Sequence, residues 1–308
     1  METPNFLIGL AAVCLLGFAT QRGGTCAVAS IVELVSERRP GRLLALIEAS
    51  VLVGGGLVLL SALGLLPIIP RGYATSAATV AGGVVLGIGA FCNRSCAIGT
   101  IARIGSGQWA YLATPIGFFL GSLAMSRMAA PEHLAGKSLV LDAPGWVAIV
   151  CILILALRLA THGWRAWRTG HGPLRYFWSP HVATSISGVA FLVVLLTVGG
   201  WTYTETLGEL ARGRPFDTMR ASLLLVALMA GAVLGGWTVG LRPKVPTAAR
   251  TGRCLVGGGL MGIGAALIPG GSDGLVFVGM PLLWPYAWLS FASMCVTIYV
   301  AVLLARPR

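Results

Sequence analysis

Long stretches without a single charged residue limit most strongly what this chain folds into. Residues 51–66, 72–93, 182–201 and 221–241 are four such runs. A helix needs about 20 predominantly apolar residues to cross the hydrocarbon core of a bilayer. One such run is compatible with a buried helix of a soluble protein, but a chain built largely from them predicts an all-α polytopic membrane protein.

The charge content agrees with a membrane location. Only 10% of the residues are charged, whereas soluble domains carry about 25%. The net charge of +12 would suggest nucleic acid in a soluble protein. Here we interpret the basic residues as topology signals and as contacts to anionic lipid, so no nucleic-acid partner is expected.

Two further classes of feature are not found in the sequence. The first apolar stretch, 6–19, follows a segment whose only charge is Glu2, and it lacks the basic start of a cleavable signal peptide. It is therefore expected to belong to the first span. No paired CxxC and no Cys/His cluster is present, so we predict neither a metal site nor a cofactor.

Hydropathy and length predict about nine transmembrane helices, several of them interrupted. Their approximate ranges are 6–35 (interrupted), 43–66, 76–101 (interrupted), 108–129, 140–160, 181–201, 221–241, 254–280 (interrupted) and 284–305.

The basic residues predict an N-terminus outside and a C-terminus inside. With that orientation, fourteen basic residues lie inside: Arg38, Arg39, Arg42, Arg103, Arg158, Arg165, Arg168, Arg175, Arg242, Lys244, Arg250, Arg253, Arg306 and Arg308. Six lie outside, namely Arg71, Arg127, Lys137, Arg212, Arg214 and Arg220. Arg22 and Arg94 remain within the membrane. This asymmetry is typical of a protein of the bacterial inner membrane.

An internal repeat appears at an offset of 175 residues. Gly82-Gly83 matches Gly257-Gly258, and the run 87–90 matches 262–265; further matches are Gly99 with Gly274, Trp109 with Trp284 and Tyr111 with Tyr286. Chance similarity between glycine-rich helices is the alternative. Because the third span runs inwards and the eighth outwards, the repeats are predicted to be inverted, a recurrent transporter design. We expect a single membrane domain with repeat one at about 9–130, connecting spans at about 131–219 and repeat two at about 220–305.

Three segments interrupt the apolar pattern at the predicted depth of the membrane. They are Gln21-Arg22-Gly23-Gly24-Thr25-Cys26, Cys92-Asn93-Arg94-Ser95-Cys96 with Gly99, and Pro269-Gly270-Gly271-Ser272-Asp273-Gly274. Irregular backbone at this depth is tolerated only inside protein or against a wet cavity. Ionisable residues there indicate function, which singles out Arg22, Arg94 and Asp273.

The composition of these segments favours a small anion. Glycines allow close approach, and half-helix N-termini present free N–H groups at the positive end of the helix dipole. The thiols of Cys26 and Cys96 are weak, polarisable donors suited to loose binding of a sulfur-bearing ion. The predicted pathway residues are Cys26, Cys96, Arg22, Arg94, Gly24, Gly99, Gly271, Ser272 and Asp273.

Structural roles compete with each of these assignments. The glycines also serve close helix packing, and the thiols are compatible with inert core positions. Arg22 and Arg94 are compatible with simple pairing to Glu33 or Asp273, and Asp273 with a helix cap.

At these residues the sequence resembles the YeeE/YedE family of sulfur transporters. The run from Gly17-Phe18 to Cys26 is similar to the first family motif, the run from Gly87 to Gly107 to the second, and Gly258-Gly259-Leu260-Met261-Gly262-Ile263-Gly264-Ala265 to the third. The resemblance covers about 9–130 and 220–300. It implies uptake of thiosulfate or a related species through an hourglass-shaped inverted repeat, with cysteines relaying the ion by S–H···S contacts. Cys26 and Cys96 match the first two family cysteines.

One departure from the family pattern bears on the substrate. The position of the third family cysteine corresponds to Gly271, which is followed by Ser272 and Asp273. An ionised Asp273 on the path would repel an anion unless Arg94 or Arg22 neutralised it. The resemblance also implies a cytosolic, TusA-like sulfurtransferase as a partner.

Three hypotheses about function follow. The first is a channel or carrier for thiosulfate or a similar anion, the second a membrane sulfur-relay enzyme, and the third the same architecture carrying another sulfur or selenium compound. The chain has no GxxxxGK[ST] loop, so ATP-driven transport by this chain is not expected. Transport rather than catalysis is the favoured prediction.

Overall fold

The computed structural model describes residues 3–66, 72–128, 138, 140, 145–168, 179–213, 217–268 and 270–305. Several residues used in the predictions above lie outside this part, namely Pro269 and the basic residues Arg71, Lys137, Arg175, Arg214, Arg306 and Arg308. The described part is helical throughout and contains no named strand, which confirms the all-α class.

The described part of the chain forms a series of α-helices with two short irregular helical turns. They are α1 (Thr3–Gly23), α2 (Ala27–Glu37), α3 (Gly41–Ala62), α4 (Ala77–Asn93), α5 (Ala97–Gly105), the 3₁₀ turn η1 (Trp109–Leu112), α6 (Ala113–Ala124), α7 (Gly145–Arg168), α9 (Pro180–Thr197), α10 (Tyr203–Ala211), α11 (Thr218–Trp237), α12 (Ala248–Leu267), α13 (Ser272–Gly274), the π-helical turn η2 (Leu275–Gly279) and α14 (Pro285–Leu304).

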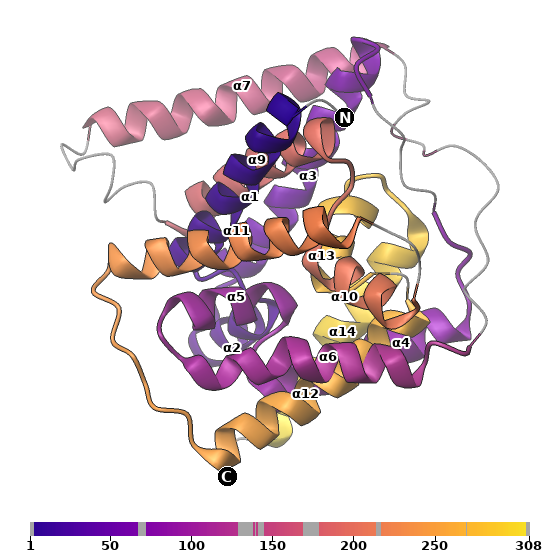
Figure 1. The fold of residues 1–308 in the computed structure, drawn as a ribbon. Coiled ribbons are helices and arrows are strands. Elements are labelled where there is room, and N and C mark those ends of the chain that lie inside the picture. Colours follow the sequence, from indigo (N-terminus) through magenta and orange to yellow (C-terminus); the bar gives the residue numbers. More distant parts are fainter. Residues whose placement is uncertain are drawn as a thin grey trace.

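Six helices of the described part are long and apolar enough to cross a membrane, or seven if a bent pair is one span. The pair is Ala248–Leu267 with Ser272–Gly279, which meet at 51°. The predicted count of nine is therefore not confirmed. The span expected at 108–129 forms only the shorter apolar helix Trp109–Ala124, and the one expected at 140–160 falls on α7, which is not among the six. Figure 1 shows α7 at the edge of the bundle.

The distribution of side chains is that of a protein in lipid. Large apolar side chains such as Leu7, Val51 and Val296 are exposed on the outside of the helices. Polar side chains such as Asn93 and Thr100 are fully buried. Since apolar surface needs no covering in a bilayer, whereas polar groups do, this is a multi-pass membrane protein.

The three interruptions fall where the sequence predicts them. α1 and α2 are separated at residues 24–26, where Gly24 has a left-handed φ of +57°. α4 ends at Arg94, which also adopts a left-handed conformation, with φ 58° and ψ 23°. Gly270, with φ +101°, makes the turn before α13. A left-handed non-glycine residue costs about 1–2 kcal/mol, so the Arg94 turn is held by its surroundings.

Helices α4 and α12 cross at the glycines that define the repeat. A Cβ at Gly82 would lie 2.9 Å from the carbonyl oxygen of Gly264, and a Cβ at Gly264 would lie 2.7 Å from that of Gly82. Likewise, a Cβ at Gly89 or at Gly257 would lie 2.8 Å from the carbonyl oxygen of the other. The helices are antiparallel, and the contacts are reciprocal, as an inverted repeat requires.

The helices that follow the breaks pack across the two predicted repeats. α14 packs on α4, where Gly83 and Gly87 approach the carbonyl oxygens of Ser290 and Met294. In the same way α6 packs on α12, where Gly258 approaches the carbonyl oxygen of Thr114. Small residues let helix backbones approach closely without a hydrophobic driving force in lipid. The glycine-rich runs are thus structural, as the packing alternative proposed.

Candidate functional site

The first two breaks meet at their cysteines. Cys26 is the residue before α2, and Cys96 is the residue before α5. The Cys96 backbone N–H donates to Cys26 Sγ at 3.4 Å, and the Ala27 N–H donates to Cys96 Sγ at 3.3 Å. Each sulfur therefore accepts from the backbone at the start of the other helix. Both side chains are buried, both thiols are free, and Ser95 Oγ lies 3.6 Å from Cys26 Sγ.

Gly99 makes this approach of the cysteines possible. Its N–H donates to Cys96 Sγ at 3.5 Å. A Cβ at this position would lie 2.6 Å from both the Cys26 Cβ and the Ser95 Oγ. Gly24 has a different role, because a Cβ there would meet nothing within 4 Å; its contribution is the left-handed turn.

A buried asparagine fixes the turn that carries Cys96. Asn93 Nδ2 donates to the Ser95 carbonyl oxygen at 2.8 Å and to Thr100 Oγ1 at 3.1 Å. Its Oδ1 accepts from Thr114 Oγ1 at 2.9 Å. The amide thus bridges α4, α5 and α6, and it positions the cysteine rather than facing an ion.

The third break lies against α10, a helix that the sequence did not assign to the site. The Gly271 N–H donates to Thr204 Oγ1 at 3.2 Å, and the Thr204 N–H donates to Asp273 Oδ2 at 3.2 Å. The Thr204 hydroxyl also bonds to Asp273 Oδ1. Ser272 Oγ is buried and has no hydrogen-bond partner within the described residues.

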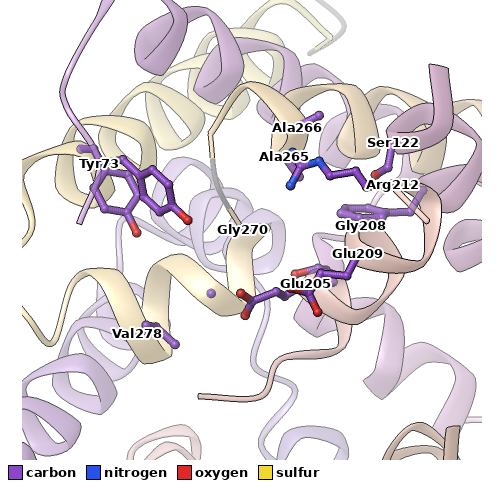
Figure 2. A pocket seen from close by; sticks show the side chains of 14 residues that line it. Tyr73, Ser122, Glu205, Gly208, Glu209, Arg212, Ala265, Ala266, Gly270 and Val278 are labelled. Atoms are coloured by element: carbon purple, nitrogen blue, oxygen red, sulfur yellow. The ribbon is translucent and has the colours of Figure 1, made fainter. Parts of the chain in front are cut away.

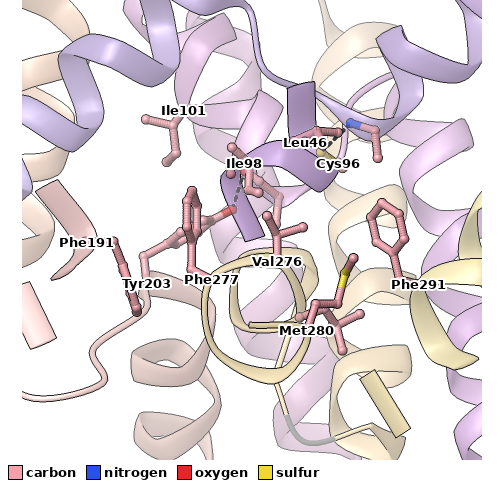
Figure 3. Packing of buried hydrophobic residues seen from close by; sticks show 14 of the residues in the cluster. Leu46, Cys96, Ile98, Ile101, Phe191, Tyr203, Val276, Phe277, Met280 and Phe291 are labelled. Carbon is pink, nitrogen blue, oxygen red and sulfur yellow. Dashed lines mark hydrogen bonds between the residues drawn. The ribbon is translucent and has the colours of Figure 1, made fainter. Parts of the chain in front are cut away.

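Tyr203 joins the third break to the cysteine pair. Its hydroxyl donates to the Ala97 carbonyl oxygen at 2.8 Å, one residue after Cys96. Figure 3 shows the Tyr203 side chain extending toward Ile98, with Phe277 beside it. Ile98, Tyr203, Phe277 and Asp273 also line a small pocket of about 30 Å³.

Tyr203 and Thr204 lie in the middle segment, where the sequence offered no match. A signal was present, because Gly23-Gly24-Thr25-Cys26 and Gly199-Gly200-Trp201-Thr202 share a glycine pair two residues before a helix cap. Cys26 precedes α2 and Thr202 precedes α10. Sequence matching missed this pair because a thiol is replaced by a hydroxyl.

The two arginines predicted within the membrane do not reach Asp273. Arg22 Nη1 donates to Thr238 Oγ1 at 3.2 Å, at the end of α11. Arg94 is exposed and lines a cavity described below. The predicted neutralisation of Asp273 by either arginine therefore finds no support in these contacts, and Thr204 is the partner of the carboxylate instead.

An acidic cavity of about 270 Å³ lies on one side of the site. It is lined by Tyr73, Phe118, Ser122, Thr204, Glu205, Gly208, Glu209, Arg212, Ala265, Ala266, Gly270, Gly274, Val278 and Tyr286. Figure 2 shows the side chains of Glu205, Glu209 and Arg212 within it. Glu205 is exposed to the cavity, whose walls enclose it on most sides. This desolvation, together with the charges of Glu209 and Asp273, raises the pKa of Glu205 to about 7.

A basic cavity of about 820 Å³ lies on the other side. It is lined by Val28, Ala29, Val32, Glu33, Ser36, Glu37, Arg42, Phe91, Cys92, Arg94, Arg103, Arg253, Val302 and Ala305. Arg42 pairs with Glu33 at 3.0 Å. Within the described residues, none of the ion pairs involves Arg94, Arg103 or Arg253.

The two cavities open at opposite ends of the same helices. Arg253 near the start of α12 lines the basic cavity, and Ala265 near its end lines the acidic cavity. Twelve residues of helix span about 18 Å. On α14, Tyr286 and Val302 show the same division. Val28 of the basic cavity follows Cys26 by two residues, and Thr204 of the acidic cavity bonds to Asp273. We call the residues Cys26, Cys96, Thr204 and Asp273 the partition.

Comparison with known proteins identifies the family of this chain. The family described as sulphur transport matches residues 22–300. The chain belongs to this family of sulphur transporters. It is also 25% identical to the thiosulfate transporter TsuA of Escherichia coli (strain K12), over 98% of this chain and 95% of that protein. The resemblance drawn from the three motifs is confirmed.

Membership of the sulphur transport family favours the transport hypotheses over the relay enzyme. The description of the family is sulphur transport, and the E. coli relative is named as a transporter. The protein is therefore a multi-pass membrane protein of a sulphur transport family.

Proposed function

We propose that this transporter conducts thiosulfate, or a closely similar sulfur oxyanion, from the acidic cavity across the partition to the basic cavity. The observation that carries the proposal is the contact between Cys26 and Cys96 at the starts of two helices, in a molecule with a cavity at each end of α12 and α14. The E. coli relative is named as a thiosulfate transporter, which supports this choice of ion.

The chemistry of the partition suits an ion of this kind. The starts of α2 and α5 offer backbone N–H groups and the positive ends of two helix dipoles. The thiols add soft S–H donors that match a polarisable terminal sulfur and bind it weakly. Passage requires binding that is favourable enough for entry and weak enough for release. The relay of the ion from one thiol to the other satisfies both demands.

The charges of the two cavities make the basic cavity the more favourable side for an anion. The basic cavity holds Arg94, Arg103 and Arg253 without carboxylate partners in the described part of the chain. An anion that crosses the partition meets these arginines next. With the positive-inside orientation, the basic cavity opens to the cytosol of a bacterial inner membrane, and the route is one of uptake. A cytosolic, TusA-like sulfurtransferase fits as the acceptor at this face.

A growth assay tests the thiol pair. The chain is produced in a bacterial strain that lacks its own sulfate and thiosulfate uptake, with thiosulfate as the sole sulfur source. Wild type is expected to support growth, and Cys26→Ala and Cys96→Ala are each expected to abolish it, because each removes one donor of the pair. Cys92→Ala is the matched control, since Cys92 lines the basic cavity but does not contact the pair.

The contradicting outcomes are specific. Growth of both cysteine variants at the wild-type rate, at equal abundance in the membrane, would exclude a thiol relay. Absence of growth with folded wild-type protein would exclude thiosulfate as the cargo.

A second candidate is transport of another sulfur or selenium compound by the same route. The observation that favours it is Gly271, which offers no thiol at the third break. Competition is the test, because the true cargo must inhibit uptake of labelled thiosulfate and must itself accumulate in the cells.

A further inference from the structure

Gly271 is the counterpart of Cys96 in the second repeat. The two positions are separated by the same offset of 175 residues that relates the glycine helices, and each is the residue before the helix that follows a break. The space for a side chain at 271 is already occupied. A Cβ there would lie 2.7 Å from Thr204 Oγ1 and 2.8 Å from Thr204 Cβ. The threonine of α10 therefore stands where the second repeat would place a thiol.

Thr204 reaches both the acidic cavity and a buried carboxylate. It is one of the residues lining that cavity, and its hydroxyl and N–H both bond to Asp273. Asp273 is 6% exposed, and no ion pair in the described part of the chain includes it. The charged or titratable groups closest to it are Tyr203 and Glu205, with Glu209 and Arg212 further along the same cavity.

The charge on this pair decides whether an anion meets repulsion or a donor. When Asp273 is ionised, the single proton of the Thr204 hydroxyl points at the carboxylate, and a negative charge lies beside the route. When Asp273 binds one proton from solvent in the acidic cavity, that charge is removed. The carboxyl then donates to Thr204 Oγ1, and the hydroxyl proton of Thr204 becomes available to an anion.

We propose that Thr204 and Asp273 form the gate between the acidic cavity and the cysteine pair, and that this gate admits an anion when Asp273 carries a proton. The inference rests on the proposed function, because it assigns a gate to the same route. In this gate, the hydroxyl of Thr204 and the carboxyl group of Asp273 take the place that a thiol would have in the second repeat.

The pH dependence of uptake is the first test. Purified protein in liposomes is supplied with labelled thiosulfate while the external pH is lowered from mildly alkaline to mildly acidic. Wild-type uptake is expected to rise as the pH falls, because protonation removes the charge of Asp273. Asp273→Asn is expected to make uptake independent of pH, since the amide is a neutral donor of the same shape. Glu205→Gln is the control for the cavity carboxyl group whose pKa is raised to about 7, and its uptake is expected to remain pH-dependent.

The hydroxyl is tested by a conservative series. Thr204→Val keeps the shape of threonine and is expected to reduce uptake at least about tenfold at all pH values, the effect of losing a hydrogen bond to a charged or buried partner. Thr204→Ser keeps the hydroxyl and is expected to restore most of the uptake. If Thr204 had a purely structural role, Thr204→Val would lower the amount of protein. At equal amounts of protein, the valine and serine variants would then take up thiosulfate at the same rate.

A variant that is expected to regain uptake tests the proposal even if the Thr204 and Asp273 variants fold poorly. Gly271→Cys alone is expected to be inactive because of its collision with Thr204. The double variant Gly271→Cys/Thr204→Gly opens the space and is expected to exceed Thr204→Gly in uptake, with a thiol in place of the hydroxyl.

The outcomes separate this inference from the proposed function. Two results would overturn the gate alone, provided that wild type takes up thiosulfate. One is an unchanged uptake rate in Thr204→Val, and the other is a wild-type pH profile in Asp273→Asn. A double variant no better than Thr204→Gly would also overturn it. Failure of wild type to take up thiosulfate at any pH would overturn the proposed function itself.

Discussion

At the scale of single residues, the sulfur atoms of Cys26 and Cys96 replace the oxygen acceptors that usually cap helices. Serine, threonine, asparagine and aspartate are preferred at this position because their oxygens accept strongly from the first N–H groups. A thiol accepts weakly. The N–H groups at the starts of α2 and α5 are therefore only lightly satisfied, and they remain available to an incoming anion.

Asn93 provides a test of how rigidly Cys96 must be held. Asn93→Ala removes three hydrogen bonds in the interior and leaves Thr114 and the Ser95 carbonyl oxygen without their partner. We expect a loss of about 1–3 kcal/mol of stability together with reduced uptake at matched abundance. Thermal unfolding in detergent and uptake in cells measure the two effects.

Ser293→Ala is the matched control for Asn93→Ala. Ser293 is exposed, and its hydroxyl bonds only to the carbonyl oxygen of Leu289 in its own helix. Equal thermal stability of the two variants would show that the Asn93 network does not hold the turn.

The sequence located the cysteines but not their surroundings. Cys26, Cys96 and Gly99 were identified because thiols and glycines interrupt an apolar pattern. Thr204 was not, because a threonine near the start of an ordinary helix carries no such signal and its contact with Asp273 spans 69 residues of sequence. The partner of Asp273 was equally hidden, since sequence reveals charges but not which polar groups meet.

At the scale of elements, the antiparallel crossing of α4 and α12 is the part of the fold that depends most on individual glycines. A Cβ at Gly257 would lie 2.7 Å from the Asn93 N and 2.8 Å from the Gly89 carbonyl oxygen. Backbone atoms of this kind cannot turn aside as a flexible side chain can. The crossing therefore has little room for adjustment.

Gly257→Ala is expected to destabilise the protein by about 1–3 kcal/mol, the usual effect of overpacking. Gly252→Ala on the same helix is the matched control, because a Cβ there would meet nothing within 4 Å. Thermal unfolding of both variants in detergent distinguishes them, and equal midpoints would contradict the close crossing.

Helix breaks were predictable from sequence, whereas the number of spans was not. Gly24, Arg94 and Gly270 lie in segments whose polar and glycine content marks them clearly, and each adopts a left-handed conformation. The predicted span at 108–129 is not confirmed, because length in sequence does not reveal that residues 109–112 form a 3₁₀ turn before a short helix.

At the scale of the whole molecule, the two cavities predict a sidedness that the positive-inside rule also gives. Glu209 lines the acidic cavity and Ser36 the basic cavity. With the proposed orientation, a membrane-impermeant maleimide is expected to label Glu209→Cys in intact cells. Ser36→Cys is expected to be labelled only after the membrane is permeabilised.

Wild-type protein gives the background of the labelling experiment, because Cys14, Cys26, Cys92, Cys96, Cys254 and Cys295 are buried or half-buried. The reverse pattern, with Ser36→Cys labelled in intact cells, would invert the orientation and turn the proposed uptake route into one of export.

The cavities also have an electrical consequence. On the proposed route, solution fills both cavities and brings each bulk potential close to the centre of the protein, so the membrane voltage falls mainly across the partition. Moving one elementary charge through that voltage changes its energy by about 2.3 kcal/mol per 100 mV. A few ångströms of displacement past Cys26 and Cys96 therefore carry nearly the full electrical work of transport, and the negative interior of a respiring cell opposes every anion at this one step.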